Sequence, residues 1–184
     1  MKWTKVKKDM GNLICGKLKH RLSIHLTKYN VSRGERTRIW ITLDKKEVFN
    51  ASSAEYLMEH DNLWEEVKRK TSKPFPECLY ECFPEFIGQV DDMDYTASIL
   101  KHRGVFNAEH VYGAFIQYPQ LTIHRALNSE NIILQALALV DRRLGKRTLE
   151  ALRYDSNVPP PLIMKFYELR CEVDNITPFK HTPS

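Results

Sequence analysis

The chain has 184 residues, of which 42% are hydrophobic, 28 are Lys or Arg and 23 are Asp or Glu. This composition excludes disorder throughout, because disordered chains lack the apolar residues that offset the entropy lost on ordering. It also excludes a membrane span, which needs about 20 apolar residues; the most apolar stretch, residues 132–140, is shorter and contains Gln135. No signal-peptide core follows the lysine-rich start, and the cysteines are expected as free thiols, so we expect a cytoplasmic protein with no membrane partner.

The charge is distributed unevenly along the chain. Residues 1–46 contain 13 basic and three acidic side chains, a formal charge of +10, whereas residues 55–94 contain four basic and eleven acidic ones, a charge of −7. Two interpretations are open: the basic part forms a surface for phosphates, or it docks on the acidic part of the same chain. We favour internal docking as the explanation for much of this charge.

The first elements are a helix and a small sheet. Apolar residues recur at steps of three and four over residues 3–18, which predicts an amphipathic helix with Gly16 as its C-terminal cap. Apolar and polar residues then alternate over 22–27 and 38–43, and a polar turn at 44–46 leads into a further short run. This period of two predicts an antiparallel meander of three strands, one face of which the helices must cover.

The rest of the chain is predicted to be helical. Ser52 or Ser53 suits the N-cap of a helix that ends at the basic residues 68–70. Prolines make residues 71–94 irregular. Short helices are predicted at 95–103, 107–117 and 120–127, the apolar segment 131–140 forms the buried centre, and prolines 159–161 begin the last helix.

We therefore predict an α+β fold in which an N-terminal helix and a three-stranded antiparallel meander pack against a mostly α-helical C-terminal half. The predicted parts form one compact unit. They are a basic helix, the meander and the following helix at 1–74, an irregular connection at 75–94, a helical half at 95–176 and a flexible tail at 177–184.

The densest cluster of charge follows the most apolar segment, where residues 141–147 read Asp-Arg-Arg-Leu-Gly-Lys-Arg. An acid beside an apolar core needs a cationic partner, for which Arg143, Lys146 and Arg170 are candidates. The favoured interpretation is a structural ion network that joins two helices; its members are Asp141, Arg143, Arg170 and Glu172. The alternative is a cationic site for phosphate or for an acidic partner protein, formed by Arg142, Arg143, Lys146 and Arg147.

A second candidate binding site lies on the polar face of the predicted sheet. Arg38 and Trp40 are two positions apart on one strand, so their side chains share a face. An aromatic ring beside a cation is suited to stacking on nucleic-acid bases.

Residues 2–8, 40–44, 136–147 and 166–172 resemble a family of uncharacterised small bacterial proteins that has no assigned activity. The resemblance rests on a WxKxKK start, a DRRxGKR string and an FYxLRCE string. It implies a bacterial cytoplasmic protein and directs attention to residues 141–147, Arg170 and Glu172, but it supplies no substrate.

Signatures of catalysis are lacking: no GxSxG, P-loop, GxGxxG or HExxH motif occurs, and no Cys or His spacing indicates a metal site. We therefore predict no catalytic residue, no metal and no cofactor, and an enzyme is the less favoured class. The favoured interpretation is a non-enzymatic module that binds another protein, of the immunity, neutraliser or adaptor type. The alternative is a nucleic-acid-binding protein that uses the basic N-terminal surface.

Overall fold

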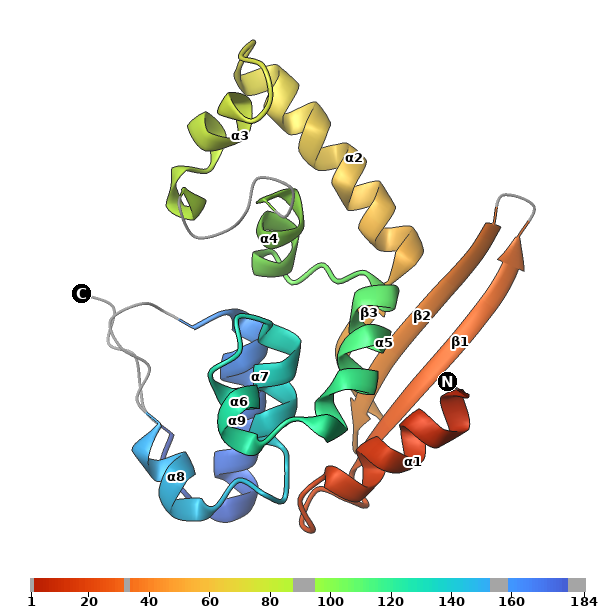
Figure 1. Cartoon of the computed structure of the whole chain (residues 1–184), viewed down its shortest axis with the longest axis vertical. Helices are drawn as coiled ribbons and strands as arrows, with labels where there is room; N and C mark the ends of the chain where they lie inside the picture. Colours follow the sequence, from red (N-terminus) through yellow and green to blue (C-terminus); the bar gives the residue numbers. More distant parts are fainter. Residues whose placement is uncertain (1, 32–33, 88–94, 153–158, 179–184) are drawn as a thin grey trace.

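The fold is a small antiparallel sheet whose apolar face is covered by helices, with a further group of helices beyond one end of the sheet (Figure 1). The computed structural model of the chain describes residues 2–31, 34–87, 95–152 and 159–178. The predicted α+β fold is confirmed, with an N-terminal helix, a three-stranded meander and a mostly helical second half. From residue 179 on, the predicted tail lies outside the described residues.

The sheet consists of β1 (Leu22–Val31), β2 (Gly34–Leu43) and β3 (Lys46–Ser52), paired in the order β1-β2-β3. Asp44 and Lys45 connect β2 to β3 with φ angles of 49° and 69°. Two successive residues with positive φ are typical of a tight hairpin turn whose twist matches that of the strands. The alternation places six side chains in the core: Leu22, Ile24, Ile39, Ile41, Phe49 and Ala51.

Several helices begin and end close to the predicted residues, but the helix at 77–82 lies in the segment predicted to be irregular, and the helix at 146–151 is not predicted. The helices are α1 (Trp3–Leu13), α2 (Ser53–Lys70), α3 (Glu77–Cys82), α4 (Tyr95–His102), α5 (Ala108–Gln117), α6 (Ile123–Leu127), α7 (Ile132–Leu139), α8 (Lys146–Ala151) and α9 (Pro161–Asp174). Short 3-10 turns lie at η1 (Pro84–Phe86) and η3 (Tyr118–Gln120). Of the two predicted N-caps of α2, Ser52 is the one used, because its hydroxyl accepts the amide of Glu55 at 3.3 Å.

Helix α1 is shorter than predicted. It ends at Leu13, and Gly16 is not its cap, because Ile14 takes an extended conformation and pairs as an isolated antiparallel bridge with Asp141. A partner 127 positions away in the sequence therefore ends the helix, and local sequence does not reveal it.

The buried side chains form two separate cores. The larger core joins α1 and the sheet to α5, α6, α7 and α9, and it includes Val6, Ile39, Phe115, Leu139 and Phe166. The smaller core lies among α2, α3 and α4, the group of helices beyond the end of the sheet in Figure 1. It consists of Leu63, Val67, Cys78, Leu79, Phe83, Tyr95, Ile99 and Leu100.

Candidate functional site

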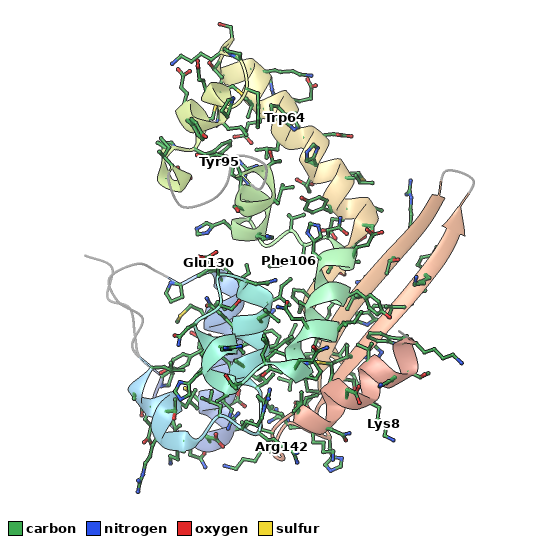
Figure 2. All side chains as sticks on the ribbon, in the orientation of Figure 1. Lys8, Trp64, Tyr95, Phe106, Glu130 and Arg142 are labelled. Carbon is green, nitrogen blue, oxygen red and sulfur yellow. The ribbon has the colours of Figure 1, made fainter. Side chains whose placement is uncertain are left out.

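The bridge between Ile14 and Asp141 brings two basic segments of the sequence together. The Cys15 amide donates to the Val140 carbonyl at 2.8 Å, and the Arg142 amide donates to the Leu13 carbonyl at 2.7 Å. The end of the lysine-rich helix α1 therefore lies directly beside the loop that contains residues 141–147. Figure 2 shows Lys8 and Arg142 at the same end of the molecule, opposite Trp64.

Asp141 is buried and fully supplied with donors. Its carboxylate accepts the Tyr118 hydroxyl at 2.6 Å, the Arg143 guanidinium at 2.7 Å and the Arg143 main-chain amide at 2.7 Å. Arg143 is thus the cation that contacts Asp141, whereas Lys146 lies 3.8 Å from Glu150 instead. The hydrogen bond to Asp141 raises the pKa of Arg143. Arg143 is therefore a partly exposed counter-ion that covers the buried carboxylate of Asp141.

Arg170 stabilises the end of helix α7 from the last helix. Its guanidinium donates to the carbonyls of Leu139, Asp141 and Leu144 at 3.2, 2.7 and 2.8 Å. Its Nε donates to Asp174 at 2.6 Å, and Asp174 also pairs with Lys17 at 3.1 Å. The Leu139 carbonyl is one that the end of a helix leaves without an intrahelical donor, and the other two carbonyls belong to the loop that follows. Arg170 thus bonds the main-chain carbonyl of Asp141 and not the carboxylate of Asp141.

Glu172, the fourth predicted member of the ion network, is exposed on α9. Within the described part of the chain it forms no ion pair, although its charge contributes to the field that raises the pKa of Arg21 after the larger effect of Asp44. The structure therefore brings together Asp141 and Arg143, adds Tyr118 as a partner of Asp141, and places Asp174 and its partner Lys17 beside Arg170.

Four exposed cations gather around the bridge, and we call them the basic surface: Lys7, Lys8, Lys19 and Arg142. Among the residues that the structure describes, none of the four has an acidic partner within 4.0 Å. Lys2, Lys5 and Arg147 are also exposed and lack an ion pair in this part of the chain, but none of the three lines the recess between α1 and β1.

A recess of about 350 Å³ opens between α1 and the start of β1. Three members of the basic surface, Lys7, Lys8 and Lys19, contribute to its walls. The other lining residues are Gly11, Asn12, Ile14, Leu22, Ser23 and Ile24. No carboxylate lines it, so every ionised group that faces the recess is positive.

In the described residues the expected docking of the basic N-terminal part on the acidic middle occurs as packing of α2 against β2, but not through ion pairs. No ion pair joins the described positions of 1–46 to those of 55–87. The acids of the middle part are paired locally instead: Glu65 with Lys68, Glu66 with Lys70 and Arg103, and Glu81 with Lys73. The acidic residues 91, 92 and 94 lie outside the described ranges.

Arg38 and Trp40 do share the polar face of the sheet, but partners within the protein engage both. Arg38 bonds Glu47 at 2.7 Å and Asn50 at 2.8 Å, and its guanidinium lies 5.0 Å from the centre of the Trp40 ring. His25 stacks on the same ring at 5.0 Å with an interplanar angle of 12°. Burial, and then the charge of Lys7, lowers the pKa of His25, which favours the neutral ring. This cluster lies on β1 and β2, apart from the bridge.

Over the described ranges, no group of three or more His, Cys, Asp or Glu side chains could hold a metal ion. Within the same ranges, every helix is too short or too polar to cross a membrane.

The model of the SF0329 protein family matches residues 2–171. The chain belongs to this family. The expected resemblance to an uncharacterised family is thereby confirmed, and the match spans both basic segments and the Asp141 and Arg170 sites of this SF0329 family member. Comparison with the curated proteins and with the solved structures gives no match.

Proposed function

We propose that this SF0329 family member is a non-enzymatic module that binds an acidic surface of a partner protein, in the manner of an immunity protein, a neutraliser or an adaptor. The observation that carries the proposal is the basic surface, in which four exposed cations gather without an acidic partner among the described residues. Like charges held close together repel one another, and a complementary anionic partner relieves this repulsion.

The structure favours a protein over single-stranded nucleic acid as this partner. Proteins that bind single strands present free aromatic rings on which bases stack. The tryptophan on α1, Trp3, packs instead against Tyr112 and Phe115, with ring centres 6.2 and 6.5 Å away. Trp40 is engaged by His25 and Arg38. The basic surface therefore presents exposed cations, but neither Trp3 nor Trp40 adds a free aromatic ring on which a base could stack.

The proposal includes a bacterial origin and a cytoplasmic location. The bacterial origin rests on the resemblance of the motifs. The location is supported by Cys15, Cys78 and Cys171, which are buried as free thiols. Free thiols suit a reducing compartment.

Affinity capture from bacterial lysate tests the proposal with two triple variants of equal charge change. One carries Lys7→Glu, Lys8→Glu and Lys19→Glu, at the recess; the matched control carries Lys2→Glu, Lys5→Glu and Arg147→Glu. We expect the wild type and the control to retain one stoichiometric protein partner after nuclease treatment, and the recess variant to lose it. Capture of nuclease-sensitive material alone, capture of no partner, or equal loss in both variants would overturn the proposal.

A salt titration against labelled duplex DNA and single-stranded RNA separates the nucleic-acid alternative. Binding through phosphates strengthens as salt falls, so it is strongest at about 50 mM salt. At this salt concentration we expect no binding to RNA or DNA that depends on the recess lysines. Binding that the recess variant loses and the control variant keeps would identify nucleic acid, and not a protein, as the partner.

A further inference from the structure

We infer that the recess between α1 and β1 binds an extended acidic segment of the partner, which adds to β1 as a fourth strand. The inference rests on the proposed function and specifies the form of the partner. Adding a strand to an exposed sheet edge is a common way to bind an extended peptide, because the main chain supplies the affinity and alternate side chains supply the specificity.

The recess follows the edge of β1 and not one of its faces. Leu22, Ser23 and Ile24 are consecutive, and all three line the recess. Successive side chains of a strand point to opposite faces of the sheet. A recess that is lined by three consecutive residues of a strand therefore runs along the backbone edge of that strand. In the described part of the chain β2 is the strand neighbour of β1, so the opposite edge of β1 has no strand against it.

The hydrogen-bond pattern shows which backbone groups face that edge. The Asp44 amide donates to the Arg21 carbonyl at 2.8 Å, and the strand register pairs Leu22 with Leu43. In an antiparallel pair, residues that bond the partner strand alternate with residues that do not. Arg21, Ser23 and His25 therefore bond toward β2, whereas Leu22, Ile24 and Leu26 direct their amides and carbonyls away from it.

One of these outward groups is already bonded by a neighbouring loop. The Leu22 amide donates to the Leu18 carbonyl at 2.8 Å, which agrees with the outward direction of this residue. Among the described residues no backbone group bonds the Ile24 amide or carbonyl from the free side. An added strand would find its first unpaired acceptor at the Leu22 carbonyl and its first unpaired donor at the Ile24 amide, both in residues that line the recess.

The lysines specify the composition of the added strand. Lys7 and Lys8 approach the edge from α1, which covers the apolar face of the sheet, and Lys19 approaches from the loop before β1. Because side chains alternate along an extended chain, every second residue of the added segment would face these lysines. The geometry therefore selects a segment with Asp or Glu at alternate positions, and it selects against a segment with Lys or Arg at those positions.

Fluorescence polarisation with the full chain and a labelled ten-residue peptide of alternating Thr and Glu tests this inference at about 50 mM salt. Two further peptides carry N-methyl groups, one on all Glu amides and the other on all Thr amides, so that charge and side chains are unchanged. When the alternating peptide is extended as a strand, the main-chain amides of all Glu residues face one edge of the strand, and those of all Thr residues face the other edge. We expect one methylated peptide to bind about tenfold more weakly or worse, and the other to bind like the parent.

The two triple variants provide the matched control on the protein side. We expect the recess variant with Lys7→Glu, Lys8→Glu and Lys19→Glu to lose at least about tenfold in affinity for the parent peptide. The variant with Lys2→Glu, Lys5→Glu and Arg147→Glu should bind like the wild type. Circular dichroism and urea unfolding check that both variants fold; the methylated peptides need no variant.

The outcomes separate the two proposals. Equal binding of both methylated peptides would overturn strand addition and leave the proposed function standing, since charge alone would then explain the affinity. Binding of a labelled ten-nucleotide oligo-dT at this site without binding of the peptide would overturn both. No binding of any probe would overturn strand addition, and the lysate capture would then decide the proposed function on its own.

Discussion

Tyr118 donates its hydroxyl hydrogen to the carboxylate of Asp141 over 2.6 Å, although the two residues lie 23 positions apart in the sequence. Each is 1% exposed. Burial first, and then the hydrogen bond to Asp141, raises the pKa of Tyr118, so the phenol stays protonated and remains a donor. With Arg143 it supplies the bonds that make a buried carboxylate tolerable at this position.

Removal of the phenol oxygen should therefore destabilise the protein. We expect Tyr118→Phe to lower the free energy of unfolding by about 1.5–3 kcal/mol, because it removes a buried hydrogen bond to a charged group. Asp141→Ala should lower it further, by about 3 kcal/mol or more, since it removes the bonds to Arg143 as well and leaves the buried Tyr118 hydroxyl without its acceptor. Urea unfolding measures both. The control is Lys146→Ala, whose exposed pair with Glu150 should be worth less than about 0.5 kcal/mol. A Tyr118→Phe protein as stable as the wild type would contradict this account.

Arg170 should not be replaceable by lysine. Its planar fork reaches the carbonyls of Leu139, Asp141 and Leu144 while Nε bonds Asp174, a pattern that one ammonium group cannot reproduce. We expect both Arg170→Lys and Arg170→Met to lose about 3 kcal/mol or more in urea unfolding. Full stability of Arg170→Lys would show that charge, and not the shape of the guanidinium, is what this position requires.

Asp174 should make part of the stability depend on pH. Burial would raise the pKa of its carboxyl, but the hydrogen bonds from Arg170 and Lys17 outweigh this effect and hold the pKa below its ordinary value of 3.8. A depressed pKa in the folded state contributes stability that is present above the ordinary value and is lost as the pH falls through the folded value. The stability difference between the wild type and Asp174→Asn should therefore be larger at about pH 6 than at about pH 2.5. Urea unfolding at the two pH values measures it, and an unchanged difference would contradict the assignment.

The turn between β2 and β3 offers a stabilising substitution. Lys45 has a φ of 69°, a conformation in which glycine has no Cβ clash. We expect Lys45→Gly to raise the unfolding free energy by less than about 1 kcal/mol, and Lys45→Val to lower it, since β-branched residues tolerate this region poorly. Thermal unfolding should rank the proteins in the order Gly, Lys, Val. The reverse order of Gly and Val would contradict the left-handed geometry.

The two cores should respond separately to truncation. Leu63 in the smaller core and Leu139 in the larger core are both 0% exposed. Each change to alanine should cost about 2–5 kcal/mol locally. In native-state hydrogen exchange, Leu63→Ala should speed exchange in α2, α3 and α4 and spare α7 and α9, while Leu139→Ala should speed it in α7 and α9. A uniform increase over all helices would show that the cores unfold as one unit.

The local parts of the fold follow from sequence patterns. The alternation in residues 22–27 and 38–43 predicts the strands, Ser52 predicts the start of α2, and the apolar segment before Asp141 predicts the buried helix α7. Each of these depends on neighbours within a few positions, where hydrophobic period and capping preferences act.

Apart from the approach of Arg170 to Asp141, the contacts between distant segments could not be predicted. The bridge at Ile14 ends α1 early and brings Arg142 beside the end of that helix. The acidic partner of Lys17 is Asp174, at the far end of α9. Tyr118 carries no charge that would mark it as a partner of Asp141, although a tyrosine in an apolar neighbourhood needs a partner for its hydroxyl. The basic surface is a product of this tertiary pairing, so composition alone predicts its charge but not its place.

The separation into two cores bears on the order in which the chain can fold while it is synthesised. The smaller core draws all its residues from Leu63 to Leu100, one continuous stretch of chain. The larger core spans Val6 to Cys171 and needs α9 to complete it. Domains generally fold as units as they emerge from the ribosome, and exposed apolar surface favours aggregation in the meantime. The α2–α4 helices can thus form before α9 is synthesised, whereas the apolar face of the sheet stays incompletely covered until then.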